Sequence, residues 1–169
     1  SPVQFRGADL LQSVVDILAE TGLAPGLLEL EVTEGAVMEN SAATIAVLQA
    51  LRRHGVRIAL DDFGTGFASL THLLSFPVDV IKIDKSFIHS LHQGNADELV
   101  RGLISLAHVL KLEVTAEGVE EPHQHDALLS MQCDRGQGYL YARPGPATDL
   151  DSLPPPDKRT NLTAVGTNA

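Results

Sequence analysis

Hydrophobic residues follow two alternating spacings along this chain. Apolar positions three or four residues apart predict helices at residues 10–18, 41–51, 70–74, 95–110 and 122–129. Short apolar runs lie between these helices and predict strands at residues 27–34, 56–60, 80–84, 112–116 and 138–141. Regular alternation of helix and strand is typical of an α/β fold in which helices cover a parallel sheet.

Four of the five expected strands end in polar or charged residues. These residues are Glu31 and Glu34, Asp61 and Asp62, Lys82 and Asp84, and Glu117 and Glu120. Polar groups at the carboxyl ends of several strands favour a TIM-like (β/α) barrel over an open sheet, whose site lies at one switch point. Because a closed barrel has eight strands, we expect an N-terminally truncated portion with about five parallel strands. We expect the domain to occupy residues 1–146 and a disordered tail to occupy residues 147–169.

Composition and charge narrow the possible functions. The chain has 22 acidic and 12 basic residues and a formal net charge of −10, which argues against a nucleic-acid-binding protein. Cys133 is the only cysteine, so a reducing compartment is the simpler expectation. There is no apolar run of membrane-spanning length and no signal-peptide pattern, so we expect a cytoplasmic protein. Ser1 stands where an initiator Met would, and we expect further sequence before it.

Carboxylates at the strand ends indicate a site for hard cations. Asp61 and Asp62 are adjacent and are followed by Gly64 and Gly66, which allow a sharp turn and a close approach to the backbone. A set of oxygen ligands, with no His or Cys at metal-ligand spacing, selects Mg²⁺ or Mn²⁺. Two such ions can activate a water molecule for attack on a phosphoester. A buried Lys82 would serve as a general base or an electrostatic clamp; the alternative is that its ammonium group extends to solvent. For Glu34 and Glu120, the alternative is a simple favourable charge at a helix N-terminus.

Five short motifs occur in a fixed order. They are Leu30-Glu31-Val32-Thr33-Glu34, Asp61-Asp62-Phe63-Gly64-Thr65-Gly66-Phe67, Ile81-Lys82-Ile83-Asp84-Lys85-Ser86-Phe87, Ala116-Glu117-Gly118-Val119-Glu120 and Gly136-Gln137-Gly138-Tyr139-Leu140. Together they closely resemble the motifs of the EAL-domain family of bacterial cyclic-di-GMP phosphodiesterases. The resemblance implies hydrolysis of cyclic-di-GMP to a linear dinucleotide by a two-metal mechanism, with Mg²⁺ or Mn²⁺ as cofactor.

The resemblance also implies individual roles for the residues of these motifs. Glu31 and Asp61 match metal ligands, and Asp62 matches a second-metal ligand or an acid that orients water. Lys82 matches the catalytic lysine, and Glu117 matches a further acid of the metal and catalytic set.

Other residues of the motifs match positions that hold the nucleotide or couple the site to regulation. Glu120 and Gln137 match positions near the bound nucleotide. Glu34 matches the glutamate that holds the loop after Asp62. The resemblance implies that this loop couples the site to a dimer surface through Phe63, Gly64, Thr65 and Gly66. By the same resemblance, we expect a homodimer, with sensor or cyclase-like domains upstream.

Two family features have no counterpart in this chain. The Glu-Ala-Leu motif and an asparagine ligand, both of which bind metal in the family, are absent from the 169 residues. We therefore expect the chain alone to be weakly active or inactive. The main alternative is a catalytically silent module that binds cyclic-di-GMP or a protein partner. A weaker alternative is an unrelated metal-dependent barrel enzyme of the enolase or aldolase type.

Overall fold

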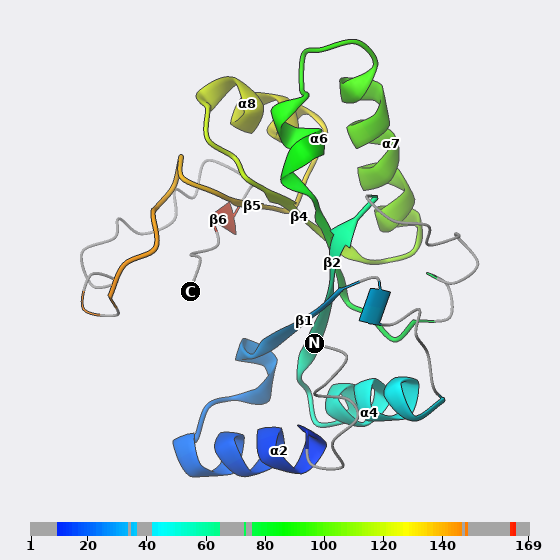
Figure 1. The fold of residues 1–169 in the computed structure, drawn as a ribbon, viewed down its shortest axis with the longest axis vertical. Coiled ribbons are helices and arrows are strands. Elements are labelled where there is room, and N and C mark those ends of the chain that lie inside the picture. Colours follow the sequence, from blue (N-terminus) through cyan, green and yellow to red (C-terminus); the bar gives the residue numbers. More distant parts are fainter. Residues whose placement is uncertain are drawn as a thin grey trace. The chain divides into compact units, whose positions relative to one another are not determined.

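The computed structural model describes residues 10–33, 35–36, 42–64, 73, 76–146, 148 and 163–164. The chain divides into two compact units, Ser1–Ile81 and Lys82–Ala169, which are coloured blue to green and green to red in Figure 1. Within the described ranges, no helix is long and apolar enough to cross a membrane.

In the described part of the first unit, strands β1 and β2 are parallel and helices α2 and α4 contact each other. Its elements are α2 (Leu10–Thr21), η1 (Pro25–Leu27), β1 (Glu29–Thr33), α4 (Ala42–Arg53), β2 (Arg57–Phe63) and the first half of β3 (Val80–Ile83). Strand β1 pairs in parallel with β2, from Glu29 opposite Arg57 to Thr33 opposite Asp61 (Figure 1). Leu48 and Leu51 of α4 and Ile58 and Leu60 of β2 are fully buried, so the apolar face of α4 lies in the core of this unit.

The two longer helices expected in the first unit are confirmed, but both strand boundaries differ from the prediction. The first strand begins only at Glu29, because residues Pro25–Leu27 form a 3-10 turn. The second strand extends to Phe63, and its ladder with β1 reaches Asp61, which lies opposite Thr33. The expected helix at residues 70–74 lies outside the described residues, except for Leu73.

The described residues of the second unit form further parallel strands and the helices α6, α7 and α8. Its elements are the second half of β3, α6 (Lys85–His89), α7 (Ala96–Val109), β4 (Glu113–Glu117), α8 (Pro122–Ser130), β5 (Arg135–Gln137) and β6 (Thr163–Ala164). Strand β4 pairs in parallel with β5, and β5 pairs in parallel with β6 (Figure 1). The largest fully buried side chains here include Ile83, Ile88, Ile104 and Leu128. The expected α/β class with parallel strands is confirmed.

The predicted last strand, at residues 138–141, is wrong. The strand is β5, at Arg135–Gln137, where Thr115 of β4 pairs with Arg135 and Glu117 pairs with Gln137. Residues 138–141 instead form a turn, in which Tyr141 N donates to Gly138 O at 3.1 Å. The extent of the domain and of the tail stays a prediction, since most of residues 147–169 lie outside the described ranges.

Helix α6 was not expected from the sequence. Asp84 caps it, because its carboxylate accepts a hydrogen bond from Ser86 N at 2.9 Å. Burial pushes the pKa of Asp84 upward, but the hydrogen bonds from Ser86 and the charge of Lys85 outweigh burial, so the pKa is lowered. The cap therefore carries a negative charge at the helix N-terminus, which stabilises the helix.

One carboxylate in each unit ties a helix to the start of a strand, and we call each arrangement a carboxylate clamp. Asp79 accepts hydrogen bonds from the guanidinium of Arg52 on α4, the shortest at 2.6 Å, and from Ile58 N of β2 at 3.0 Å. Asp134 contacts Nε2 of His108 on α7 at 2.9 Å and accepts from Val114 N of β4 at 2.9 Å. Both clamps lie at the amino ends of their strands, where barrel residues usually serve stability.

Candidate metal and catalytic site

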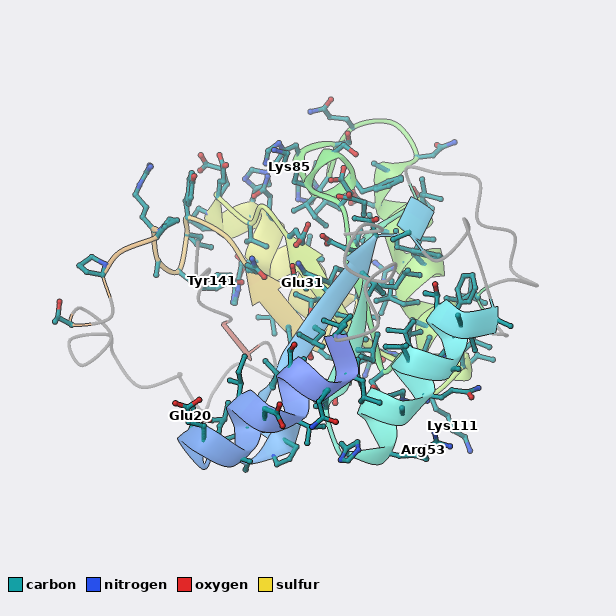
Figure 2. The ribbon with its side chains drawn as sticks, turned by 60° about the horizontal axis from the view of Figure 1, so that its bottom comes forward. Glu20, Glu31, Arg53, Lys85, Lys111 and Tyr141 are labelled. Carbon is teal, nitrogen blue, oxygen red and sulfur yellow. The ribbon has the colours of Figure 1, made fainter. Side chains whose placement is uncertain are left out.

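The first unit carries acidic residues near the carboxyl ends of β1 and β2. Glu31 lies opposite Ala59, and Asp61 lies opposite Thr33, two positions further along the ladder (Figure 2 labels Glu31). Side chains two positions apart in a strand point to the same face, and so do residues paired across a ladder. Glu31 and Asp61 are therefore placed on one face of this strand pair.

Asp62 has an unusual backbone conformation that bears on the adjacent carboxylate. Successive side chains in a regular strand point to opposite faces, which would separate Asp61 from Asp62. Asp62 instead has φ of +57°, in the left-handed region that Asp tolerates better than most residues. The two carboxylates offer oxygen atoms within 4.8 Å of each other. The left-handed residue thus fits a role in gathering two acidic groups at the end of β2.

This donor set fits a hard divalent cation. Asp61 is half-buried, and its Oδ1 atom is buried, whereas Asp62 is exposed. Two close carboxylates repel each other as they lose hydration, and a cation between them would offset that repulsion. Oxygen-only donors favour Mg²⁺ or Mn²⁺ over Zn²⁺.

The loop that follows these acids is only partly within the described ranges. Phe63 is buried and Gly64 has φ of +98°, so the turn after β2 needs the glycine. Glu34, Thr65 and Gly66 lie outside the described residues. Their predicted role in coupling the site to a dimer surface stays a prediction.

The second unit carries a buried ion pair between Lys82 and Glu117. Lys82 Nζ lies 2.5 Å from Glu117 Oε1, and the side chains are 4% and 19% exposed respectively. Lys82 is on β3, whose four residues are all buried, and Glu117 is the last residue of β4. The ammonium group therefore does not extend to solvent. It is held by the carboxylate of Glu117 at the carboxyl end of β4.

The loop after β4 is shaped by close backbone contacts. Gly118 has φ of +67°, and a Cβ atom there would lie 2.5 Å from the Cβ of Lys85. Lys85, labelled in Figure 2, is the first residue of α6. Gln137 lies beside Glu117 in the β4–β5 ladder. Glu120 is exposed, with an oxygen 3.8 Å from Nε2 of His89. The structure thus brings Lys82, Glu117 and Gln137 together at the strand ends.

Gln124 is a residue of this region that the sequence reasoning did not single out. Its buried side chain accepts hydrogen bonds from Glu120 N at 2.8 Å and Glu121 N at 3.0 Å. Glu121 is the N-cap of α8 and forms a capping box with Gln124. Glu120 therefore precedes the helix and is not one of its first-turn acids. The sequence Glu121-Pro-His-Gln124 carries the capping-box signal that could have indicated this arrangement.

Tyr141 is a second residue that the sequence reasoning did not single out. Its hydroxyl group lies 2.9 Å from Nδ1 of His125 on α8. Burial raises the pKa of Tyr141 to about 12. The tyrosine is therefore neutral at ordinary pH and fixes the turn after β5 against α8.

Comparison with known proteins identifies the family. The chain is 44% identical over 147 residues to the cyclic di-GMP phosphodiesterase NbdA of Pseudomonas aeruginosa, covering 86% of this chain and 19% of that protein. Among solved structures it is similar to the PaMucR phosphodiesterase in complex with c-di-GMP, with a TM-score of 0.83, 40% identity, and coverage of 89% of this chain and 61% of that chain.

A third similarity is to Klebsiella pneumoniae BlrP1 in complex with manganese and cyclic di-GMP. Its TM-score is 0.76 at 33% identity, covering 83% of this chain and 36% of that chain. The chain spans about a fifth of the length of the curated relatives that it matches. Residues 1–144 match the EAL domain family, and the chain belongs to that family.

Proposed function

We propose that this protein takes part in the hydrolysis of cyclic-di-GMP to a linear dinucleotide, with two divalent cations at the site. The observation that carries the proposal is the pair of carboxylates of Asp61 and Asp62, gathered within 4.8 Å in a member of the EAL family. A related protein, NbdA, is a cyclic di-GMP phosphodiesterase, and the similar BlrP1 structure contains manganese and the dinucleotide.

The cations in this proposal are Mg²⁺ or Mn²⁺. Asp61, Asp62, Glu31 and Glu117 would hold them through carboxylate oxygens, the donors that these ions prefer. When bound, such a pair of ions lowers the pKa of a water molecule and neutralises charge that develops on the phosphoester. The number of ions and this assignment of ligands rest on the family resemblance together with the acidic character of the strand ends.

Lys82 acts in this proposal on the attacking water and on the phosphate charge. A buried ammonium group can donate hydrogen bonds to water or to a phosphate oxygen, and its charge is little screened. Glu117, 2.5 Å away, restricts the position of Nζ and so sets the direction of those hydrogen bonds. Gln137, beside Glu117 in the ladder, and Glu120 would then contact the nucleotide.

The proposal extends to regulation and partners. Glu34, Phe63, Gly64, Thr65 and Gly66 would couple the occupied site to a homodimer surface. The chain spans about a fifth of its curated relatives, one of which is a bifunctional diguanylate cyclase and phosphodiesterase, so we infer partner domains of this kind. We further infer that the 169-residue chain alone has weak activity or none, since the family's Glu-Ala-Leu motif is not in it.

The test is turnover of cyclic-di-GMP by the full-length protein in Mg²⁺, followed by chromatography of the linear product. We expect Asp61→Asn to lower kcat at least about 100-fold, which corresponds to about 2.7 kcal/mol of barrier. Glu20→Gln is the matched control, because Glu20 is an exposed acid of α2 in the same unit (Figure 2).

Calorimetric titration of the dinucleotide in Ca²⁺ separates binding from turnover. Binding without hydrolysis in Mg²⁺ or Mn²⁺ would refute the proposed activity and favour the silent nucleotide-binding module. Equal turnover by Asp61→Asn and Glu20→Gln would refute the role of the acidic pair.

A further inference from the structure

Two histidine rings from separate elements of the second unit lie against each other. His92 is in the turn that joins α6 to α7 (Figure 1), and His123 is the second residue of α8. Their ring centroids are 5.3 Å apart, with an interplanar angle of 42°. Both side chains are exposed, and neither belongs to the acidic and lysine set described above.

His92 is held in place by Asp97, in the first turn of α7. The backbone of His92 has φ of +67°, and its N–H donates to Asp97 Oδ1 at 2.7 Å. Its ring Nδ1 lies 3.2 Å from Asp97 Oδ2. A carboxylate that accepts a hydrogen bond from Nδ1–H leaves Nε2 with its lone pair available, which is the usual orientation of a metal-binding histidine.

The spacing of the two rings matches that of two imidazoles bound to one tetrahedral ion. A zinc–nitrogen bond of about 2.0–2.1 Å places each ring centroid about 3.2 Å from the ion. At a tetrahedral angle, two such centroids are about 5.2 Å apart. The observed separation is 5.3 Å. The separation of the two rings therefore fits that of two imidazoles that share one ion.

We propose that His92 and His123 form a binding site for a divalent transition-metal ion of the Zn²⁺ class, with Asp97 as the positioning residue. Imidazole nitrogen favours Zn²⁺, Ni²⁺ and Cu²⁺, whereas Mg²⁺ prefers carboxylate oxygen. The site is therefore chemically distinct from the acidic one at the strand ends. Water completes the coordination, so the ion is exchangeable and the site suits a response to metal availability better than a structural role.

The test is calorimetric titration of the full chain with Zn²⁺ in excess Mg²⁺, which occupies the carboxylate sites. We expect one Zn²⁺ site whose affinity falls at least tenfold in His92→Gln and in His123→Gln. Asp97→Asn should weaken binding by about 10-fold, as is typical when a partner of a ligating histidine is removed. His54→Gln is the control, because His54 is exposed at the end of α4 in the first unit, and it should leave binding unchanged.

Paramagnetic Ni²⁺ provides a second measurement that does not depend on affinity. Substoichiometric Ni²⁺ should broaden the NMR resonances of the His92 and His123 rings before those of the other histidines. The proposal is overturned if both rings broaden no faster than His54, or if the double variant His92→Gln/His123→Gln binds Zn²⁺ as the parent protein does. Far-ultraviolet circular dichroism of each variant checks that these surface substitutions leave the fold intact.

Discussion

The ion pair between Lys82 and Glu117 should make its two single variants unequally unstable. Removal of one partner from a buried pair leaves an uncompensated charge and costs about 3–5 kcal/mol. Lys82→Met leaves the Glu117 carboxylate, whose side chain is 19% exposed and partly hydrated, so we expect a loss near 3 kcal/mol. Glu117→Gln leaves an ammonium group whose side chain is only 4% exposed, so we expect a loss nearer 5 kcal/mol.

The double variant Lys82→Met/Glu117→Gln provides the decisive comparison. It contains neither charge, so it should be more stable than Glu117→Gln alone although it carries one substitution more. Urea unfolding of the full chain at pH 7.5, followed by circular dichroism, measures all four free energies of unfolding. Lys111→Met is the control, since Lys111 is exposed (Figure 2), and its change should stay within about 0.5 kcal/mol.

Additive losses in the two single variants would refute this reasoning. Additivity would mean that Nζ and the carboxylate do not depend on each other for their burial. A double variant less stable than Glu117→Gln would lead to the same conclusion. In either case, the proposed role of Glu117 in positioning Lys82 would lose its physical basis.

Two further predictions concern other residues of the second unit. Gly118→Ala should destabilise the chain by about 1–3 kcal/mol in urea unfolding, because φ is +67° and the new Cβ would lie 2.5 Å from that of Lys85. Gly102→Ala on α7 is the control: its new Cβ would meet nothing within 4 Å, so this variant should be neutral or stabilising. Equal stability of the two variants would contradict this. Burial raises the pKa of Cys133 from 9.0 to about 12, so the thiol ionises at a lower pH in the unfolded chain than in the folded one. The neutral thiol therefore contributes fully to stability below pH 9, and this contribution declines between pH 9 and 12. Stability measured from pH 8 to 11 should therefore fall less steeply in Cys133→Ala, and identical slopes would refute the assignment.

The order and type of the main elements could be predicted because hydrophobic spacing reports burial. The apolar residues before Lys82 place it on a strand, and β3 is buried throughout. Boundaries set by pairing were harder to predict. Strand β2 continues through Asp61 because Thr33 of β1 pairs with it, and two acids give no hydrophobic signal for a strand.

Strand β5 shows the same limit more strongly. Arg135, Gly136 and Gln137 form a strand through pairing with β4, while the apolar residues that follow them lie in a turn. Local sequence could not reveal this, because the β-propensity of a residue depends on its neighbours across the sheet. The pairing of Lys82 with Glu117 likewise depends on strand register, although each residue was expected at its own strand end.

The carboxylate clamps have a consequence for how the chain folds. Asp79 reaches back 27 residues to Arg52 and 21 to Ile58, and Asp134 reaches back 26 residues to His108 and 20 to Val114. Each clamp thus closes an arch of nearly the same chain length. Because loop-closure entropy grows only with the logarithm of that length, the two arches have almost equal closure entropies. Neither arch draws on a residue of the other unit, so each can close while the other is still open.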